Sequence, residues 1–131
     1  MSIIRQALDK LAPAISLHPT AARTSTGNGT AVDLQQYDGD LIVLLDSAAA
    51  SAGTNPTLDI KLQASDTQGG SYADISGAVF TRVTDAAASQ QTLVISKSES
   101  PRWLRIVYTI GGTNSPSFTF SVNAVGVKKY G

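Results

Sequence analysis

Apolar and polar residues follow the two-residue period of β-strands along most of this chain. Residues 41–45 form a continuous apolar run, which favours a strand covered on both faces. Residues 58–65 alternate between apolar and polar side chains, which is typical of a strand with one face on a core and the other in water. A loop of small residues separates the two runs. We therefore take residues 40–66 as the centre of the predicted fold.

Further strand signals recur at the spacing expected of an all-β domain. They lie at 31–34, 78–83, 92–95, 102–110 and 118–124, with turn-forming segments such as 66–71 and 111–116 between them, and residues 125–130 close the chain. Seven or eight strands of this kind predict an antiparallel β-sandwich, either jelly-roll-like or immunoglobulin-like. The chain has no cysteine, so one specific signature of antibody-type domains is absent.

The first residues have a different pattern. Apolar residues at helical spacing predict a short helix over residues 3–12 that ends at Pro13. We therefore divide the chain into an arm or short helix at 1–19 and a β-sandwich domain at 20–131. A helix of this length is marginal alone, so it must dock either on its own domain or on a neighbouring subunit. The candidate contact residues of the arm are Ile3, Ile4, Leu8 and Leu11.

The small-residue loop at 47–55 is a second candidate contact region. Ser51 and Gly53 represent it, because small side chains allow a partner's backbone to approach closely. A solvent-exposed tip with no partner is the other interpretation. Residues 53–57 and 111–117 also resemble each other, and shared turn chemistry explains the likeness as well as a duplicated unit does.

Composition places the chain among single-domain globular proteins. It has 131 residues, 42% of them hydrophobic, and no apolar run long enough for a membrane helix. The first residues lack the apolar core and cleavage site of a signal peptide, so we expect synthesis in the cytoplasm and no membrane partner. Only 15% of the residues are charged and the net charge is zero. Few charges are available to protect strand edges, which favours association.

Residues with catalytic or ligand-binding chemistry are sparse. The sole histidine is His18, and no cysteine accompanies it, which argues against a zinc site and against a catalytic triad. Asp38 and Asp40 flank a glycine, a spacing typical of a turn and not of a calcium loop. We predict a protein that is not an enzyme and has neither metal nor cofactor.

Arg102, Trp103 and Arg105 place an aromatic ring between two cations, as single-strand nucleic-acid binders do. The neutral overall charge argues against that function, and a lone tryptophan beside arginine is more often part of strand packing. A carbohydrate-binding sandwich would need several exposed aromatic rings, and the chain has eight aromatic residues in all. Trp103 remains a candidate contact residue, and we predict no nucleic-acid partner.

Four segments resemble small virion proteins of tailed bacteriophages. They are residues 32–39, 57–66, 72–80 and 102–105, together with the pair Leu45-Asp46, and the likeness covers roughly residues 30–127. The resemblance implies a capsid decoration or cement protein, a β-sandwich that sits on the shell and clamps neighbouring major capsid subunits. It implies the major capsid protein as partner, a homo-oligomer of two or three copies, and a place on the virion surface. A minor head or tail protein and a carbohydrate- or receptor-binding module are the alternatives.

Overall fold

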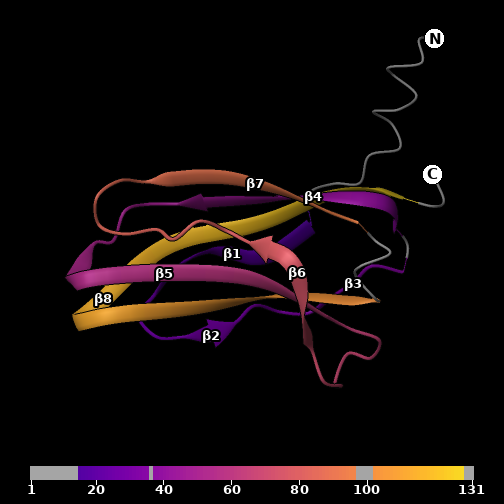
Figure 1. The fold of residues 1–131 in the computed structure, drawn as a ribbon, viewed down its shortest axis with the longest axis horizontal. Helices are drawn as coiled ribbons and strands as arrows, with labels where there is room; N and C mark the ends of the chain where they lie inside the picture. Colours follow the sequence, from indigo (N-terminus) through magenta and orange to yellow (C-terminus); the bar gives the residue numbers. More distant parts are fainter. Residues whose placement is uncertain (1–14, 36, 97–101, 129–131) are drawn as a thin grey trace, which may run out of the picture.

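The protein is an antiparallel sandwich of two sheets (Figure 1). The structure is a computed structural model and describes residues 15–35, 37–96 and 102–128. The eight strands are β1 (Ile15–Arg23), β2 (Gly27–Asn28), β3 (Val32–Asp33), β4 (Tyr37–Ser47), β5 (Ala52–Ser65), β6 (Ala73–Val79), β7 (Ser89–Ser96) and β8 (Trp103–Lys128). No helix occurs within these residues. The predicted helix over 3–12 lies outside the described part of the chain.

Strand β8 belongs to both sheets. Its second half lies between β1 and β4, and β7 pairs with the other edge of β4, which gives sheet A the order β1-β8-β4-β7. Its first half lies between β5 and the short strands β2 and β3, and β6 completes sheet B. All pairs are antiparallel, and this arrangement is that of a jelly roll. The predicted all-β sandwich is confirmed, and the strand order decides for the jelly-roll alternative.

Strand β8 and the consecutive strands β4 and β5 pass together from one sheet to the other. β4 and β5 follow each other along the chain, and both pair with β8, from Tyr37 opposite Lys128 to Ser65 opposite Trp103. Figure 1 shows β8 and the segment that joins β4 to β5 crossing from one layer to the other at the end of the sandwich where β5 begins. The sequence predicted two strands separated by a turn at 111–116. The structure instead keeps that segment in β8, because it pairs with β5 across the corner.

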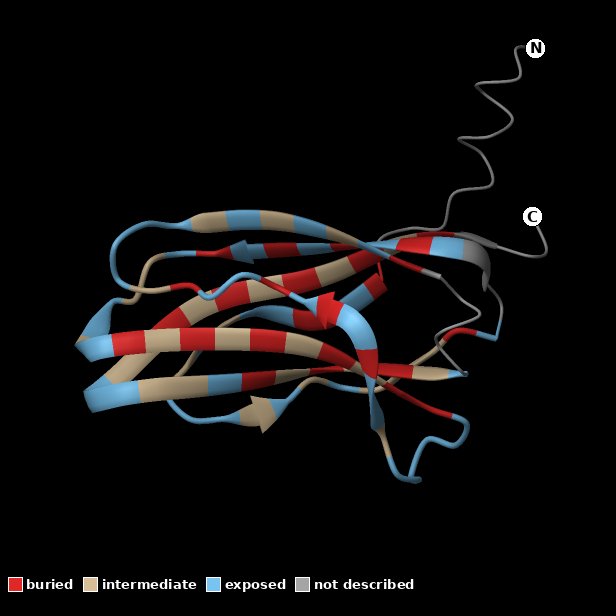
Figure 2. Cartoon of the chain, viewed as in Figure 1, coloured by how far each residue is buried: buried red, intermediate tan, exposed pale blue. Residues whose placement is uncertain are grey.

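The core lies between the two sheets and follows the predicted alternation (Figure 2). In β5 from Pro56 onward and in residues 103–108 of β8 every second residue is buried, as are the alternate residues at 118–126. The largest fully buried side chains include Phe118 and Phe120 from sheet A and Leu58, Ile60 and Leu104 from sheet B. Burial of such side chains contributes roughly 1.5–3 kcal/mol each. The apolar period of the sequence thus sets which face of each strand points inward.

The interpretation of residues 41–45 as a strand covered on both faces is wrong. Leu41, Val43 and Leu45 are buried, whereas Ile42 and Leu44 remain 45% and 38% exposed. Every strand of a two-layer sandwich has one face toward the other sheet and one face outward. The apolar run therefore supplies both a core row and an apolar row on the outer surface of sheet A.

The boundary of the N-terminal arm also needs correction. The prediction places residues 15–19 in the arm, but they form the first half of β1, which pairs with β8 from Ile15 opposite Ala124. Ile15, Leu17 and His18 are all buried. The sandwich therefore includes residues 15–19, and Ile15 and Leu17 belong to its core.

Candidate interaction surfaces

The predicted contact residues Ser51 and Gly53 lie at the corner where β5 and β8 cross between the sheets. The backbone N–H of Ser51 donates a 2.9 Å hydrogen bond to the carbonyl of Ser117, and Ala52 is paired with the same residue. The Asn114 side-chain amide donates a 2.6 Å hydrogen bond to the hydroxyl of Thr54. We call residues 51–55 and 112–115 the corner tip. All but Gly53 are exposed.

Backbone strain is concentrated at the corner tip. Asn55, Asn114 and Ser115 have φ values of 50°, 59° and 56°, and they are the only described residues other than glycine with positive φ. A non-glycine residue in this region costs on the order of 1–2 kcal/mol, less for asparagine. Such clusters persist where the surrounding pairing enforces them, and they are found at functional sites more often than elsewhere.

Two glycines make the corner sterically feasible. Gly53 and Gly112 have φ values of 107° and 111°. A Cβ on Gly53 would lie 2.6 Å from the Pro116 Cα, and one on Gly112 would lie 2.9 Å from the Asn55 carbonyl oxygen. The likeness between residues 53–57 and 111–117 now has a structural context. The two segments pair with each other in the same corner, so they meet the same conformational demand.

A second surface is the outer face of sheet A. Ile42 is paired with Val94 of β7 on one side and with Val125 of β8 on the other, and Leu44 is paired with Thr92 and Asn123. Val94 is 65% exposed, and Val125 is half-buried. Exposed apolar residues that adjoin across strands form a patch, whereas singly scattered ones need no explanation. We call Ile42, Leu44, Val94 and Val125 the apolar face of sheet A.

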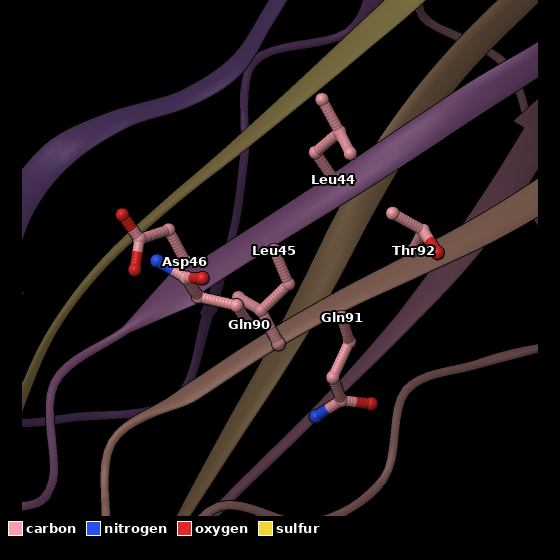
Figure 3. Close-up of a pocket in the computed structure, with 6 residues that line it drawn as sticks. All are labelled: Leu44, Leu45, Asp46, Gln90, Gln91 and Thr92. Carbon is pink, nitrogen blue, oxygen red and sulfur yellow. The ribbon is translucent and has the colours of Figure 1, made fainter.

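A shallow hollow adjoins this face between β4 and β7. It has a volume of about 280 Å³ and is lined by Leu44, Leu45, Asp46, Gln90, Gln91 and Thr92. Figure 3 shows Leu44 and Thr92 on the same side of the two strands, with the Gln91 amide on the opposite side. The Gln91 amide bonds to the Thr81 carbonyl at 2.8 Å and to Ser89 at 2.9 Å. The lining thus combines two leucines with one carboxylate, two amides and one hydroxyl.

Trp103 lies at the far end of the sandwich from the corner tip. It opens β8 and is paired with Ser65 in β5 and with Asp33 in β3. Its ring is half-buried, and the Arg102 guanidinium lies 5.5 Å from the ring centroid. The structure therefore does not bring Trp103 together with Ser51 and Gly53.

The two arginines beside Trp103 are engaged within the protein. Arg102 donates two hydrogen bonds to the Asp33 carboxylate, at 3.0 and 2.8 Å. Arg105 donates to Gln63, and its guanidinium lies 4.1 Å from the centroid of the Tyr72 ring. This bonding fits the strand-packing interpretation of the segment better than a nucleic-acid contact.

His18 belongs to β1 and is buried. Its Nε2 accepts a 2.9 Å hydrogen bond from the Arg23 side chain, so the neutral ring holds its proton on Nδ1. The ring stacks on Phe120 at 4.3 Å and meets Tyr108 edge-on at 5.3 Å. Burial, and then the positive charge of Arg23, lower the pKa of His18 from its ordinary value.

Among the described residues, no group of three or more histidine, cysteine, aspartate or glutamate side chains is placed to hold a metal ion. No helix in that part of the chain is long and apolar enough to span a membrane. The predicted contact residues of the arm, Ile3, Ile4, Leu8 and Leu11, lie outside the described residues. The apolar face of sheet A was not predicted. Its signal was present, because a five-residue apolar run in a two-layer sandwich must expose two of its members.

The topology places the chain in the class of jelly-roll β-sandwiches, and comparison with solved structures agrees. The infectious bursal disease virus VP2 subviral particle aligns with a TM-score of 0.55 and 16% identity over 92% of this chain and 33% of that chain. The structure of the Gt strain of that virus gives 0.58 and 14%, over 93% and 33%. This protein thus spans about a third of each of those chains. At such low identity the likeness concerns the fold alone.

A looser resemblance is to the SPBc2 prophage-derived protein YomS, with a TM-score of 0.47 and 12% identity over 88% of this chain and 92% of that one. A likeness of this strength has no bearing on function. No protein-family model matches the sequence, and no curated protein is significantly similar to it.

Proposed function

We propose that this protein is a non-enzymatic structural component of a virion, of the capsid decoration type, that binds the lattice of the major capsid protein. Three features support the proposal. The fold is a jelly roll, a fold also found in the VP2 subviral particle. The described residues contain no metal-binding cluster. Several segments of the sequence resemble small virion proteins of tailed bacteriophages.

The strained corner tip is the observation that carries the proposal. Its three non-glycine residues with positive φ are exposed at one end of the sandwich. Pairing between β5 and β8 holds the tip in one conformation, so little conformational entropy is lost when a partner binds. The serine and threonine side chains of the tip present hydroxyl groups to that partner, and the asparagine side chains present amide groups. The small side chains also leave the backbone of the tip accessible. We propose that the corner tip contacts the shell.

The location of the protein tests the function. Antibody-gold labelling or cryo-electron microscopy of virions should show it at regular positions over the head. A position confined to the tail would contradict the decoration role and favour the minor-tail alternative. Analytical ultracentrifugation of the purified protein tests the proposed dimer or trimer separately.

The contact is tested with bulky charged side chains at the two ends of the molecule. Ser51→Arg at the corner tip should reduce binding to emptied shells at least tenfold in a co-sedimentation assay. Gln68→Arg is the matched control, because Gln68 is exposed on the turn between β5 and β6 at the other end of β5. Equal binding by the two variants would exclude the corner tip as the contact. Specific binding on a glycan array that is abolished by Trp103→Ala would favour the carbohydrate-binding alternative.

A further inference from the structure

The apolar face of sheet A has no cover among the described residues. Ile42, Leu44 and Val94 are exposed, and the cross-strand pairs join them into one surface with Val125. The surrounding positions on the same side of the sheet are polar, among them Ser16, Asn123, Thr92 and Gln90. A bounded apolar surface of this kind marks a place where another segment packs.

The charged side chains described on this side of the sheet are acidic. Asp40 and Asp46 lie in β4 on either side of Ile42 and Leu44, and both are exposed. No lysine or arginine belongs to this side among its described side chains. A segment that covers the face should therefore combine apolar side chains with positive charge.

Residues 3–11 of the same chain have this composition. Ile4, Leu8 and Leu11 recur at helical spacing, and Arg5 and Lys10 outnumber the single acidic residue, Asp9. A helix of about ten residues is roughly 15 Å long, whereas β8, β4 and β7 together span roughly 10 Å. Such a helix is marginal until its apolar side packs on another surface.

The point where the described chain begins places this segment within reach. Ile15 is paired with Ala124, and Ala124 is paired with Val43. The start of β1 therefore lies level with Val43, which stands between Ile42 and Leu44 in β4. Two strand spacings, roughly 10 Å, separate β1 from β4. The backbone from Leu11 to Ile15, when extended, covers roughly 13 Å. The chain is thus long enough to pass over the edge strand and reach the face.

We infer that residues 3–11 of each chain dock on the apolar face of sheet A of that same chain. Ile4, Leu8 and Leu11 pack against Ile42, Leu44, Val94 and Val125, while Arg5 and Lys10 lie toward Asp46 and Asp40. The short connection raises the effective concentration of the segment at its own face above that of any second copy. The inference does not depend on the proposed contact with the shell.

Engineered cysteines test the inference directly, because the chain has none of its own. Leu8→Cys combined with Leu44→Cys is treated with a short bis-maleimide at low protein concentration, and the products are separated by denaturing electrophoresis and mass spectrometry. The control combines Leu8→Cys with Val79→Cys, since Val79 is 56% exposed on β6 of the other sheet. We expect a crosslink within one chain that forms at least five times faster in the first variant than in the control.

Charge exchange provides the second measurement. Arg5→Glu with Lys10→Glu should slow the intramolecular crosslink several-fold, and adding Asp40→Lys with Asp46→Lys should restore it. A crosslink between two chains would overturn the inference in favour of a second copy as the occupant. Equal crosslinking in the Leu44 and Val79 variants would overturn it in favour of an uncovered face that is free for another partner.

Discussion

The buried His18 should make the stability of this protein depend on pH between about pH 5 and pH 7. Burial beside Arg23 lowers its pKa in the folded state, and its only acceptor nitrogen is already occupied by the Arg23 N–H. In the unfolded chain its pKa returns to about 6.5. Below that pH the unfolded state binds one proton more than the folded state, so the free energy of unfolding falls as pH falls. The free energy of unfolding is therefore at its full value above about pH 6.5 and falls below it.

The magnitude follows from proton linkage. One proton of difference changes the free energy of unfolding by about 1.4 kcal/mol per pH unit. Between pH 6.5 and pH 5 the limit is therefore about 2 kcal/mol, which is reached only if the folded protein stays unprotonated throughout. The backbone groups of Phe120 and Pro19 raise the pKa of His18 in part and reduce this figure.

Urea unfolding followed by Trp103 fluorescence at half-unit steps from pH 8 to pH 5 measures this dependence. The stability of the wild-type protein should be level above pH 7 and should decrease below pH 6.5. His18→Phe keeps a ring against Phe120 and Tyr108 but cannot titrate, so its stability should be level over the whole range. A level wild-type profile, or an equal decrease in the variant, would refute the assignment of the pH dependence to His18.

Three further substitutions test other parts of the fold by the same unfolding assay. Gly112→Ala places a Cβ against backbone at positive φ and should lower the free energy of unfolding by about 1–3 kcal/mol. Gly69→Ala, with open space around the added Cβ, should change it little. Equal effects of the two substitutions would mean that the corner backbone can relax. Phe118→Ala empties a fully buried site and should cost about 3–5 kcal/mol, and Val94→Ala on the outer face should cost far less. Arg82→Ala breaks only an exposed ion pair with Asp59, so a loss above about 1 kcal/mol would contradict the expectation that this pair contributes little.

The fold was largely predictable because the inward and outward faces of sandwich strands differ in polarity, so each strand alternates between apolar and polar residues. Residues 58–65 and 104–110 alternate between apolar and polar positions, and in the structure the apolar members face the core. Apolar content alone did not separate a strand with two covered faces from a strand with one covered face and one exposed apolar face. Residues 41–45 belong to the second kind, which was visible only once the number of layers was known.

The candidate site was predictable only in part. Ser51 and Gly53 were selected because small residues permit close approach, and they do lie at an exposed corner. Their pairing with residues near Ser117 depends on contacts between segments more than sixty positions apart in the sequence, which no local pattern encodes. Trp103 was selected for its chemistry alone, and the strand order places it at the opposite end of the molecule.

The sequence by itself determined the strand content of this protein, the inward face of most strands and the scarcity of catalytic side chains, because these depend on local alternation and residue type. Only the tertiary structure decided that residues 15–19 form an edge strand, that β8 serves both sheets and that Ile42 and Leu44 face outward. These features follow from which strands pair across the chain. That choice is made by the packing of the whole core and not by any one segment.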